Sequence, residues 1–226
     1  MIAIITAMEV ELRDILSRME APQPVERPGL WGYTGKLYGQ TVLAAGCGVG
    51  KVCAAQCAQL IISEYHPRAV LHSGIAGAVS PDLRHLDVVV ARELTYRDMS
   101  DKTKREFLPF GGCFVADPKL VTLIRKACPQ SHLGCIATGD LFVNSGEEKA
   151  RLRRDYNALC AEMEGAAVAH VCVVNRMPFA VIRCISDLAD DDAYGDYEQF
   201  ELLAARKSAD ILCDAIGYLT AKEGEQ

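Results

Sequence analysis

The chain has 226 residues, of which 50% are hydrophobic and 24% are charged. This length and composition predict a single domain, residues 1–226, built around one substantial hydrophobic core. The net charge of −6 at pH 7 offers no basic surface to a phosphate backbone, which excludes nucleic acid as an expected partner.

Apolar runs of strand length alternate with segments of helical period along the chain. The predicted strands are 2–5, 41–45, 69–72, 87–91, 134–137 and 179–185, and the predicted helices are 9–19, 51–65, 118–127, 165–175 and about 197–221. This alternation is typical of an α/β sheet with helices on both faces. Such sheets bind ligands at the carboxyl ends of their strands, so we expect functional residues there.

The apolar runs and the cysteines indicate the cellular compartment of the protein. The run at residues 2–5 has no basic segment before it and does not resemble a secretory signal, and no run approaches the ~18 residues of a membrane span. The ten cysteines are scattered among small apolar residues, as expected for buried thiols in a reducing compartment. Cys53 and Cys57 lie four residues apart, but no second ligand pair accompanies them. We therefore expect a cytoplasmic protein without a metal or a membrane partner.

Glycines follow three of the predicted strands, in Gly46-Cys47-Gly48-Val49-Gly50-Lys51, Gly74-Ile75-Ala76-Gly77 and Gly139-Asp140. Glycine there permits close approach of backbone N–H groups to a ligand, although it also serves ordinary tight turns. The first loop fits neither nucleotide motif. Val52 follows Lys51 where a phosphate loop needs Ser or Thr, and Lys51 stands where a dinucleotide fingerprint needs glycine. We therefore expect neither ATP nor NAD, and no cofactor.

Two glutamates lie in the first turn of the first predicted helix. Glu11 lies on the side of Met8 and Ile15 by the three- and four-residue spacing of a helix, close to the apolar stripe, whereas Glu9 is expected in solvent. Glu11 is therefore the candidate for a buried carboxylate. The alternative is that it only stabilises the helix N-terminus electrostatically.

A second acidic segment precedes the almost wholly apolar helix that begins at Gly165. Glu162 and Glu164 both flank Met163 there, and periodicity does not choose between them as the functional carboxylate. Either could instead be a capping residue.

The third acidic segment ends the strand predicted over 179–185. Asp187 is either a partly desolvated acid or a cap formed with Ser186. Arg183, inside the same strand, is expected to need a carboxylate partner, because arginine is rarely buried without one.

Taken in order, six motifs resemble those of the 5′-methylthioadenosine/S-adenosylhomocysteine nucleosidases, within the purine nucleoside phosphorylase superfamily. The motifs are Ile4-Ile5-Thr6-Ala7-Met8-Glu9-Val10-Glu11, Gly48-Val49-Gly50-Lys51-Val52, Gly74-Ile75-Ala76-Gly77, Gly139-Asp140-Leu141-Phe142-Val143, Glu162-Met163-Glu164 and Arg183-Cys184-Ile185-Ser186-Asp187. The resemblance implies a three-layer α/β/α fold with a mixed, partly barrel-like central sheet, assembled as a homodimer. It also implies a hydrolase of methionine salvage that releases adenine from methylthioadenosine, S-adenosylhomocysteine or both.

The resemblance further implies roles for single residues. Glu11 resembles the residue that activates water, Asp187 the one that protonates the purine, and Glu164 the one that holds the ribose hydroxyls. Arg183 resembles a partner that orients Glu11 and the water. The implied substrate contacts are Phe142 stacked on the adenine, the backbone of Val143 at the base edge, Met163 and Met8 near the ribose and the alkylthio group, and Gly77, Val49 and Ser186.

The chemistry agrees with these roles. Cleavage of an N-ribosidic bond develops positive charge on the sugar and negative charge on the purine, so it needs a proton donor, a carboxylate near the sugar and a base for water. We expect hydrolysis and not phosphorolysis, because Glu9 and Glu11 should repel phosphate and His72 precedes Ser73-Gly74 where the phosphorylases place a cationic residue.

Two features depart from the family pattern. Ile75 stands where the bacterial family commonly has serine, and the segment 96–112 is short. Ile75 removes a hydroxyl expected near the water or the ribose, and the short segment is the one that helps shape the 5′ end of the pocket in the family. A related nucleosidase for another 5′-substituted nucleoside of the futalosine type is therefore an alternative. A non-catalytic nucleoside-binding protein on the same fold is a third possibility, which a water-activating base at Glu11 argues against.

Overall fold

The structure, a computed structural model, describes residues 1–223, so the last three residues of the predicted domain lie outside the described part. The strands are β1 (Ile2–Thr6), β2 (Glu20–Pro24), β3 (Trp31–Leu37), β4 (Gln40–Gly46), β5 (Val70–Ala78), β6 (Val88–Tyr96), β7 (Cys113–Val115), β8 (His132–Thr138), β9 (Ala158–Glu162) and β10 (Phe179–Asp187). The helices are α1 (Glu9–Leu16), α2 (Lys51–Tyr65), α3 (Asp101–Phe107), the 3-10 turn η1 (Pro109–Gly112), α4 (Pro118–Ala127), α5 (Gly146–Tyr156), α6 (Gly165–Val174) and α7 (Ala193–Glu223).

The strands form one mixed sheet that closes on itself at one end. β10 pairs in parallel with β5 and antiparallel with β6, while β8 and β9 complete a ring of five strands. β1, β4, β3 and β2 continue from β5 as an open extension, and β7 pairs with β6. This arrangement confirms the predicted mixed, partly barrel-like sheet.

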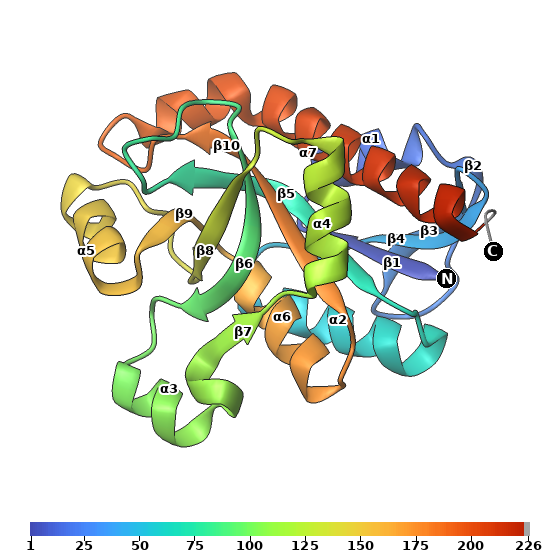
Figure 1. Ribbon diagram of the computed structural model, residues 1–226, viewed down its shortest axis with the longest axis horizontal. Helices are drawn as coiled ribbons and strands as arrows, with labels where there is room; N and C mark the ends of the chain where they lie inside the picture. Colours follow the sequence, from blue (N-terminus) through green and yellow to red (C-terminus); the bar gives the residue numbers. More distant parts are fainter. Residues whose placement is uncertain (224–226) are drawn as a thin grey trace.

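Helices cover both faces of the sheet (Figure 1). α7 packs along β10 and β5 and contacts α1 and α4, whereas α2 and α6 pack together on the opposite face. The predicted three-layer α/β/α fold is therefore confirmed. None of the described helices is long and apolar enough to span a membrane.

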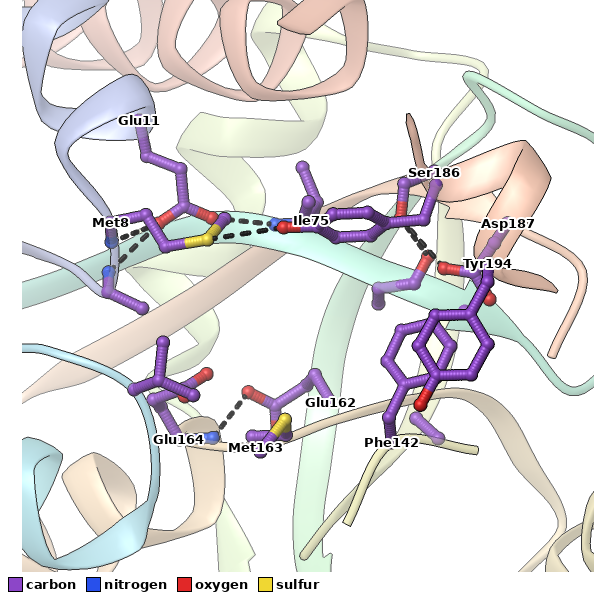
Figure 2. A pocket seen from close by; sticks show the side chains of 16 residues that line it. Met8, Glu11, Ile75, Phe142, Glu162, Met163, Glu164, Ser186, Asp187 and Tyr194 are labelled. Atoms are coloured by element: carbon purple, nitrogen blue, oxygen red, sulfur yellow. Dashed lines mark hydrogen bonds between the residues drawn. The ribbon is translucent and has the colours of Figure 1, made fainter. Parts of the chain in front are cut away.

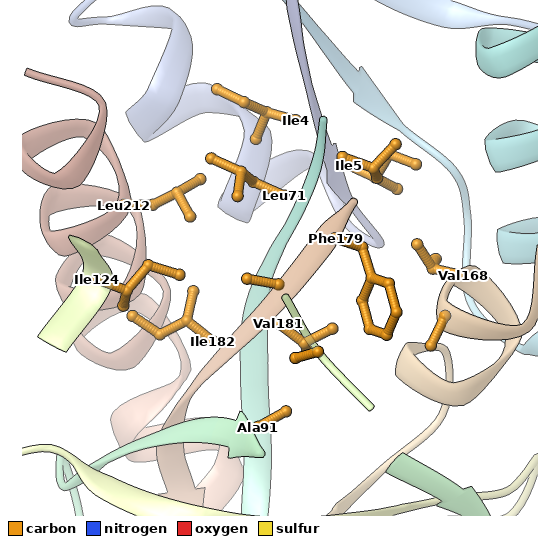
Figure 3. Packing of buried hydrophobic residues seen from close by; sticks show 14 of the residues in the cluster. Ile4, Ile5, Leu71, Ala91, Ile124, Val168, Phe179, Val181, Ile182 and Leu212 are labelled. Atoms are coloured by element: carbon orange, nitrogen blue, oxygen red, sulfur yellow. The ribbon is translucent and has the colours of Figure 1, made fainter. Parts of the chain in front are cut away.

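The core lies on both sides of the central strands β1, β5 and β10 (Figure 3). Ile4 and Ile182 point toward α7, whereas Ile5 and Val181 point toward α6, because successive side chains of a strand face opposite sides. All nine residues of β10 are buried. A carboxyl or guanidinium group placed on this strand therefore loses solvent, which is the condition the candidate site needs.

Several elements differ from the sequence-based prediction. The glycine segment 74–77, expected after a strand, lies inside β5, which runs to Ala78. α7 begins at Ala193, before the predicted start near Tyr197. Within the described residues, seven elements were not predicted, namely β2, β3, β7, β9, α3, η1 and α5. Of these, β2 is exposed throughout and α5 buries only Leu152, so neither carries the apolar periodicity on which the prediction depends.

Candidate active site

A cavity of about 260 Å³ opens where β1, β5, β9 and β10 end (Figure 2). It collects most of the predicted site residues, namely Met8, Glu11, Val49, Gly77, Phe142, Met163, Glu164, Ser186 and Asp187. Val143 borders a smaller adjoining cavity that shares Gly77 and Asp187. Arg183 is buried beneath the pocket and does not line it. Segments far apart in the sequence therefore meet in one pocket.

Glu11 is a buried carboxylate held by three backbone N–H groups. Its Oε2 accepts hydrogen bonds from Ala7 (2.8 Å) and Met8 (3.0 Å), and its Oε1 accepts one from Ile75 (3.2 Å). Only 3% of Glu11 is exposed, whereas Glu9 is exposed, so the predicted division of the two glutamates is confirmed. Burial raises the pKa of Glu11, and the hydrogen bonds and the charge of Arg183 oppose that rise in part.

Gly74 provides the space for this carboxylate. A β-carbon at position 74 would lie 2.8 Å from Oε1 of Glu11 and 3.3 Å from Nη1 of Arg183. Any side chain at this point of β5 would displace the carboxylate or the guanidinium, because real β-carbons do not approach other atoms so closely.

The contacts of Glu162 and Glu164 show which of the two carboxyl groups is bound by the fold and which has an oxygen left for a ligand, a choice that helical periodicity left open. Glu162 pairs with Arg183 (Nη2 to Oε2, 2.6 Å), bonds Thr138 Oγ1, and accepts the N–H groups of Glu164 (3.0 Å) and Gly165 (2.7 Å). Among the described residues, Glu164 accepts a hydrogen bond only from the N–H of Gly50, at 2.7 Å. Glu162 is thus fully engaged by the fold, while Glu164 keeps an oxygen for a ligand.

The partner of Arg183 differs from the predicted one. Arg183 was expected to orient Glu11, but it forms its ion pair with Glu162. Its effect on Glu11 is electrostatic, because the charge of Arg183 lowers the pKa of Glu11. Nη2 of Arg183 also lies 2.5 Å from Nε2 of His72. A guanidinium only donates, so Nε2 accepts and Nδ1–H of His72 donates to Ile5 O at 2.9 Å.

His72 is consequently a neutral residue. Burial, then the charge of Arg183, lowers its pKa to about 3. His72, Glu162 and Glu164 bring three potential metal-ligand atoms within 4.8 Å of one another. The guanidinium of Arg183 already contacts His72 and Glu162, so it supplies the positive charge that such a cluster needs.

Glu164 holds its proton more tightly than an ordinary glutamate. Burial and the neighbouring charge of Glu162 raise its pKa to about 8. Near pH 7 this raised pKa favours a carboxylic acid at position 164, which can both donate and accept a hydrogen bond.

Asp187 ends β10 with 1% of its surface exposed. Oδ2 accepts a hydrogen bond from Ser186 Oγ (2.9 Å) and Oδ1 accepts one from the N–H of Ala189 (3.0 Å). Burial raises the pKa of Asp187, against the opposing effect of these two bonds. Gly77 is required beside it, because a β-carbon there would lie 2.5 Å from Oδ1.

Two aromatic pocket residues were not predicted, Tyr194 and Tyr197 at the start of α7. Tyr194 stacks on Phe142 with ring centroids 4.7 Å apart, so one face of the ring expected to hold adenine is covered (Figure 2). The hydroxyl of Tyr197 lies 2.8 Å from Glu201 and 3.4 Å from Met8 Sδ. Two aromatic residues three apart soon after Asp187 were the available signal. Tyr194 lies before the predicted helix start near Tyr197, so it was not assigned to the helix.

Residues 1–217 match the family model described as the phosphorylase superfamily. The chain belongs to this superfamily, which contains nucleoside phosphorylases and nucleosidases.

Among the solved structures similar to this chain are several nucleosidases. The 5′-methylthioadenosine/S-adenosylhomocysteine nucleosidase of Neisseria meningitidis, in complex with methylthio-immucillin-A, is 30% identical; the match covers 96% of this chain and 98% of that one with a TM-score of 0.90. The S-adenosylhomocysteine nucleosidase of Streptococcus pyogenes is 31% identical, with 96% of each chain covered and a TM-score of 0.92. Futalosine hydrolase of Helicobacter pylori is 29% identical, with 96% and 97% covered and a TM-score of 0.90. The predicted resemblance is confirmed, and both kinds of nucleosidase are similar to this chain.

Proposed function

We propose that the protein hydrolyses the N-ribosidic bond of 5′-methylthioadenosine, S-adenosylhomocysteine or both, and releases adenine. The observation that carries this proposal is the arrangement of three buried carboxyl groups, Glu11, Glu164 and Asp187, around one pocket. A protein that only binds a nucleoside has no need for three carboxyl groups taken out of water, because each costs free energy to bury.

In the proposed mechanism each carboxyl group has one task. Glu11 takes a proton from water, whose oxygen attacks C1′ as the bond from C1′ to the purine breaks. Asp187 gives its proton to the purine, so the leaving base departs neutral. Glu164 holds the ribose hydroxyls, and the ion pair of Arg183 and Glu162 supports the site from beneath.

The remaining predicted residues would bind the substrate. Phe142 and Val143 would hold the base, and Met163, Met8, Val49, Gly77 and Ser186 would contact the rest of the nucleoside. Tyr194 must leave the face of Phe142 if the base is to use it, since a 4.7 Å ring separation has no room for a third ring.

Release of adenine from methylthioadenosine is expected at the same rate in phosphate-free buffer and in added phosphate, with free methylthioribose as the sugar product. A phosphate site needs cationic or donor groups, whereas His72 is neutral and buried and Glu11 is an acceptor. Chromatography of the products checks this. Base release that requires phosphate and yields a ribose 1-phosphate derivative would overturn hydrolysis, and tight binding without turnover would favour the non-catalytic alternative.

A futalosine-type substrate is the second candidate. Ile75 lines the pocket in place of the expected serine, and the futalosine hydrolase noted above is 29% identical to this chain, against 30% and 31% for the two nucleosidases. Assaying methylthioadenosine, S-adenosylhomocysteine, adenosine, inosine and futalosine side by side separates the two. Preferred cleavage of futalosine would replace the proposed substrate without changing the reaction type.

We also propose a homodimer. Four large apolar side chains on α2, α3, η1 and α6 are strongly exposed: Val52 (81%), Phe107 (75%), Phe110 (77%) and Val174 (63%). Their helices lie together on the lower part of Figure 1, where α6 contacts both α2 and η1. An exposed apolar surface of this kind is typical of an interface. Light scattering after gel filtration is expected to give twice the chain mass, and Val52→Glu should shift it toward the monomer; a wild-type monomer would contradict the proposal.

A further inference from the structure

Among the described residues, α5 gives no side chain to the pocket, yet it reaches the turn that follows the pocket residue Asp187. Nζ of Lys149 donates a hydrogen bond to the carbonyl oxygen of Leu188 at 2.5 Å. The same ammonium lies 3.8 Å from Oδ2 of Asp190. Lys149 is therefore anchored across this turn, although α5 and β10 are distant in sequence.

The peptide group that Lys149 contacts is the one that holds Asp187. The carbonyl of Leu188 and the N–H of Ala189 belong to one planar peptide, and in a trans peptide they point in opposite directions. The N–H end donates to Oδ1 of Asp187 at 3.0 Å. A charged donor on the carbonyl end polarises the peptide and strengthens the bond at its other end. One hydrogen-bonded chain thus runs from the ammonium through the peptide to the carboxyl group.

The turn itself needs such support. Ala189 has φ of 52°, a left-handed conformation that alanine adopts only at a cost. Its methyl group is fully buried in a small apolar cluster that also contains Leu152 of α5. α5 is thus linked to the turn in two ways, since Leu152 shares the apolar cluster of Ala189 and Lys149 bonds the carbonyl of Leu188.

We propose that Lys149 is a positioning residue for Asp187: its ammonium fixes the peptide between Leu188 and Ala189, which in turn aims Oδ1 of Asp187. This inference rests on the proposed function, in which Asp187 protonates the leaving purine. A general acid contributes about 10²–10⁴-fold, and a misplacement of about 1 Å can remove much of that.

The test measures kcat and KM of Lys149→Met on two substrates, methylthioadenosine and a methylthioribosyl nitrophenol whose leaving group needs no proton. We expect kcat for methylthioadenosine to fall about 10–100-fold with KM changed less than about threefold, and kcat for the nitrophenol to fall less than about threefold. Lys149→Arg should recover most of the loss, because a guanidinium also donates to a carbonyl. Arg154→Met is the matched control, since Arg154 lies on the same helix with 70% of its side chain exposed and bonds its neighbour Asp155.

Equal losses on both substrates, an unchanged kcat for methylthioadenosine, or failure of arginine to restore activity would overturn the role of Lys149. Lys149→Gln, which keeps a shorter neutral donor, serves as a second variant if methionine prevents folding, and it should show the same dependence on the leaving group. Asp187→Asn, measured alongside, distinguishes the general-acid role of Asp187 from the positioning role of Lys149. If Asp187→Asn shows the dependence and Lys149→Met does not, only this inference fails. If neither shows it, the general-acid role fails and this inference fails with it.

Discussion

Glu11→Gln is expected to abolish turnover of methylthioadenosine, with kcat lowered by at least about 10²-fold, while substrate binding stays within a few-fold of wild type. The amide keeps the shape of the side chain, and its single oxygen can still accept the N–H groups of Ala7 and Met8, which both bond Oε2 in the wild type, whereas the bond from Ile75 to Oε1 is lost. It cannot take a proton from water. Single-turnover kinetics for chemistry and titration with a non-hydrolysable analogue for binding check the two halves of this result.

Glu9→Gln is the matched control, because Glu9 lies in the same helical turn but is exposed. Its kcat should stay within about twofold of wild type, as is usual for a surface substitution. Comparable losses in both variants, or a Glu11→Gln defect confined to binding, would contradict the assignment of Glu11 as the base.

The sequence was sufficient to predict burial and helix boundaries wherever these depend on local periodicity. The helical spacing from Met8 to Ile15 placed Glu11 on the buried side of α1, and the structure agrees. α2 and α4 also begin and end at the predicted residues, because a helix with an apolar stripe and clear boundaries carries its signal within one segment.

The sequence was not sufficient to predict the partners of side chains that meet through long-range contacts. Glu162 is engaged because β8 brings Thr138 and β10 brings Arg183 to it, and no local pattern shows either contact. No local pattern shows the partner of Arg183 either. Pairing of β10 with β5 places Arg183 opposite Gly74, and from there its side chain reaches Glu162 and His72 instead of bonding Glu11.

The segments between the strong elements were the hardest to predict. α5 is polar on nearly all sides and buries only Leu152, so it did not resemble a core element, and the strand β9 was not predicted either. Yet β9 closes the sheet ring beside the pocket, and α5 supports the turn after Asp187. Sequence periodicity reports burial of whole faces, and it says little about elements that act through one or two side chains.

Asp187→Asn is expected to lose about 10²–10⁴-fold in kcat on methylthioadenosine and to keep most of its activity on a methylthioribosyl nitrophenol. The reason is the state of the carboxyl group. Burial raises the pKa of Asp187, which keeps a proton available, and Arg183 is bound to Glu162 and does not hold Asp187 ionised. Asparagine fits the same space and accepts the N–H of Ala189, but it has no acidic proton to give.

The pH dependence provides an independent check on the same residue. The neutral acid is the active form, so kcat for methylthioadenosine should fall as pH rises through the raised pKa of Asp187, and it should also fall as pH decreases through the pKa of Glu11, which must be ionised to act as a base. With the nitrophenol substrate the alkaline fall should disappear, whereas the acidic fall should remain. Equal losses of Asp187→Asn on both substrates, or an alkaline fall of the same size with the nitrophenol, would leave Asp187 as a structural residue and require another proton donor for the purine.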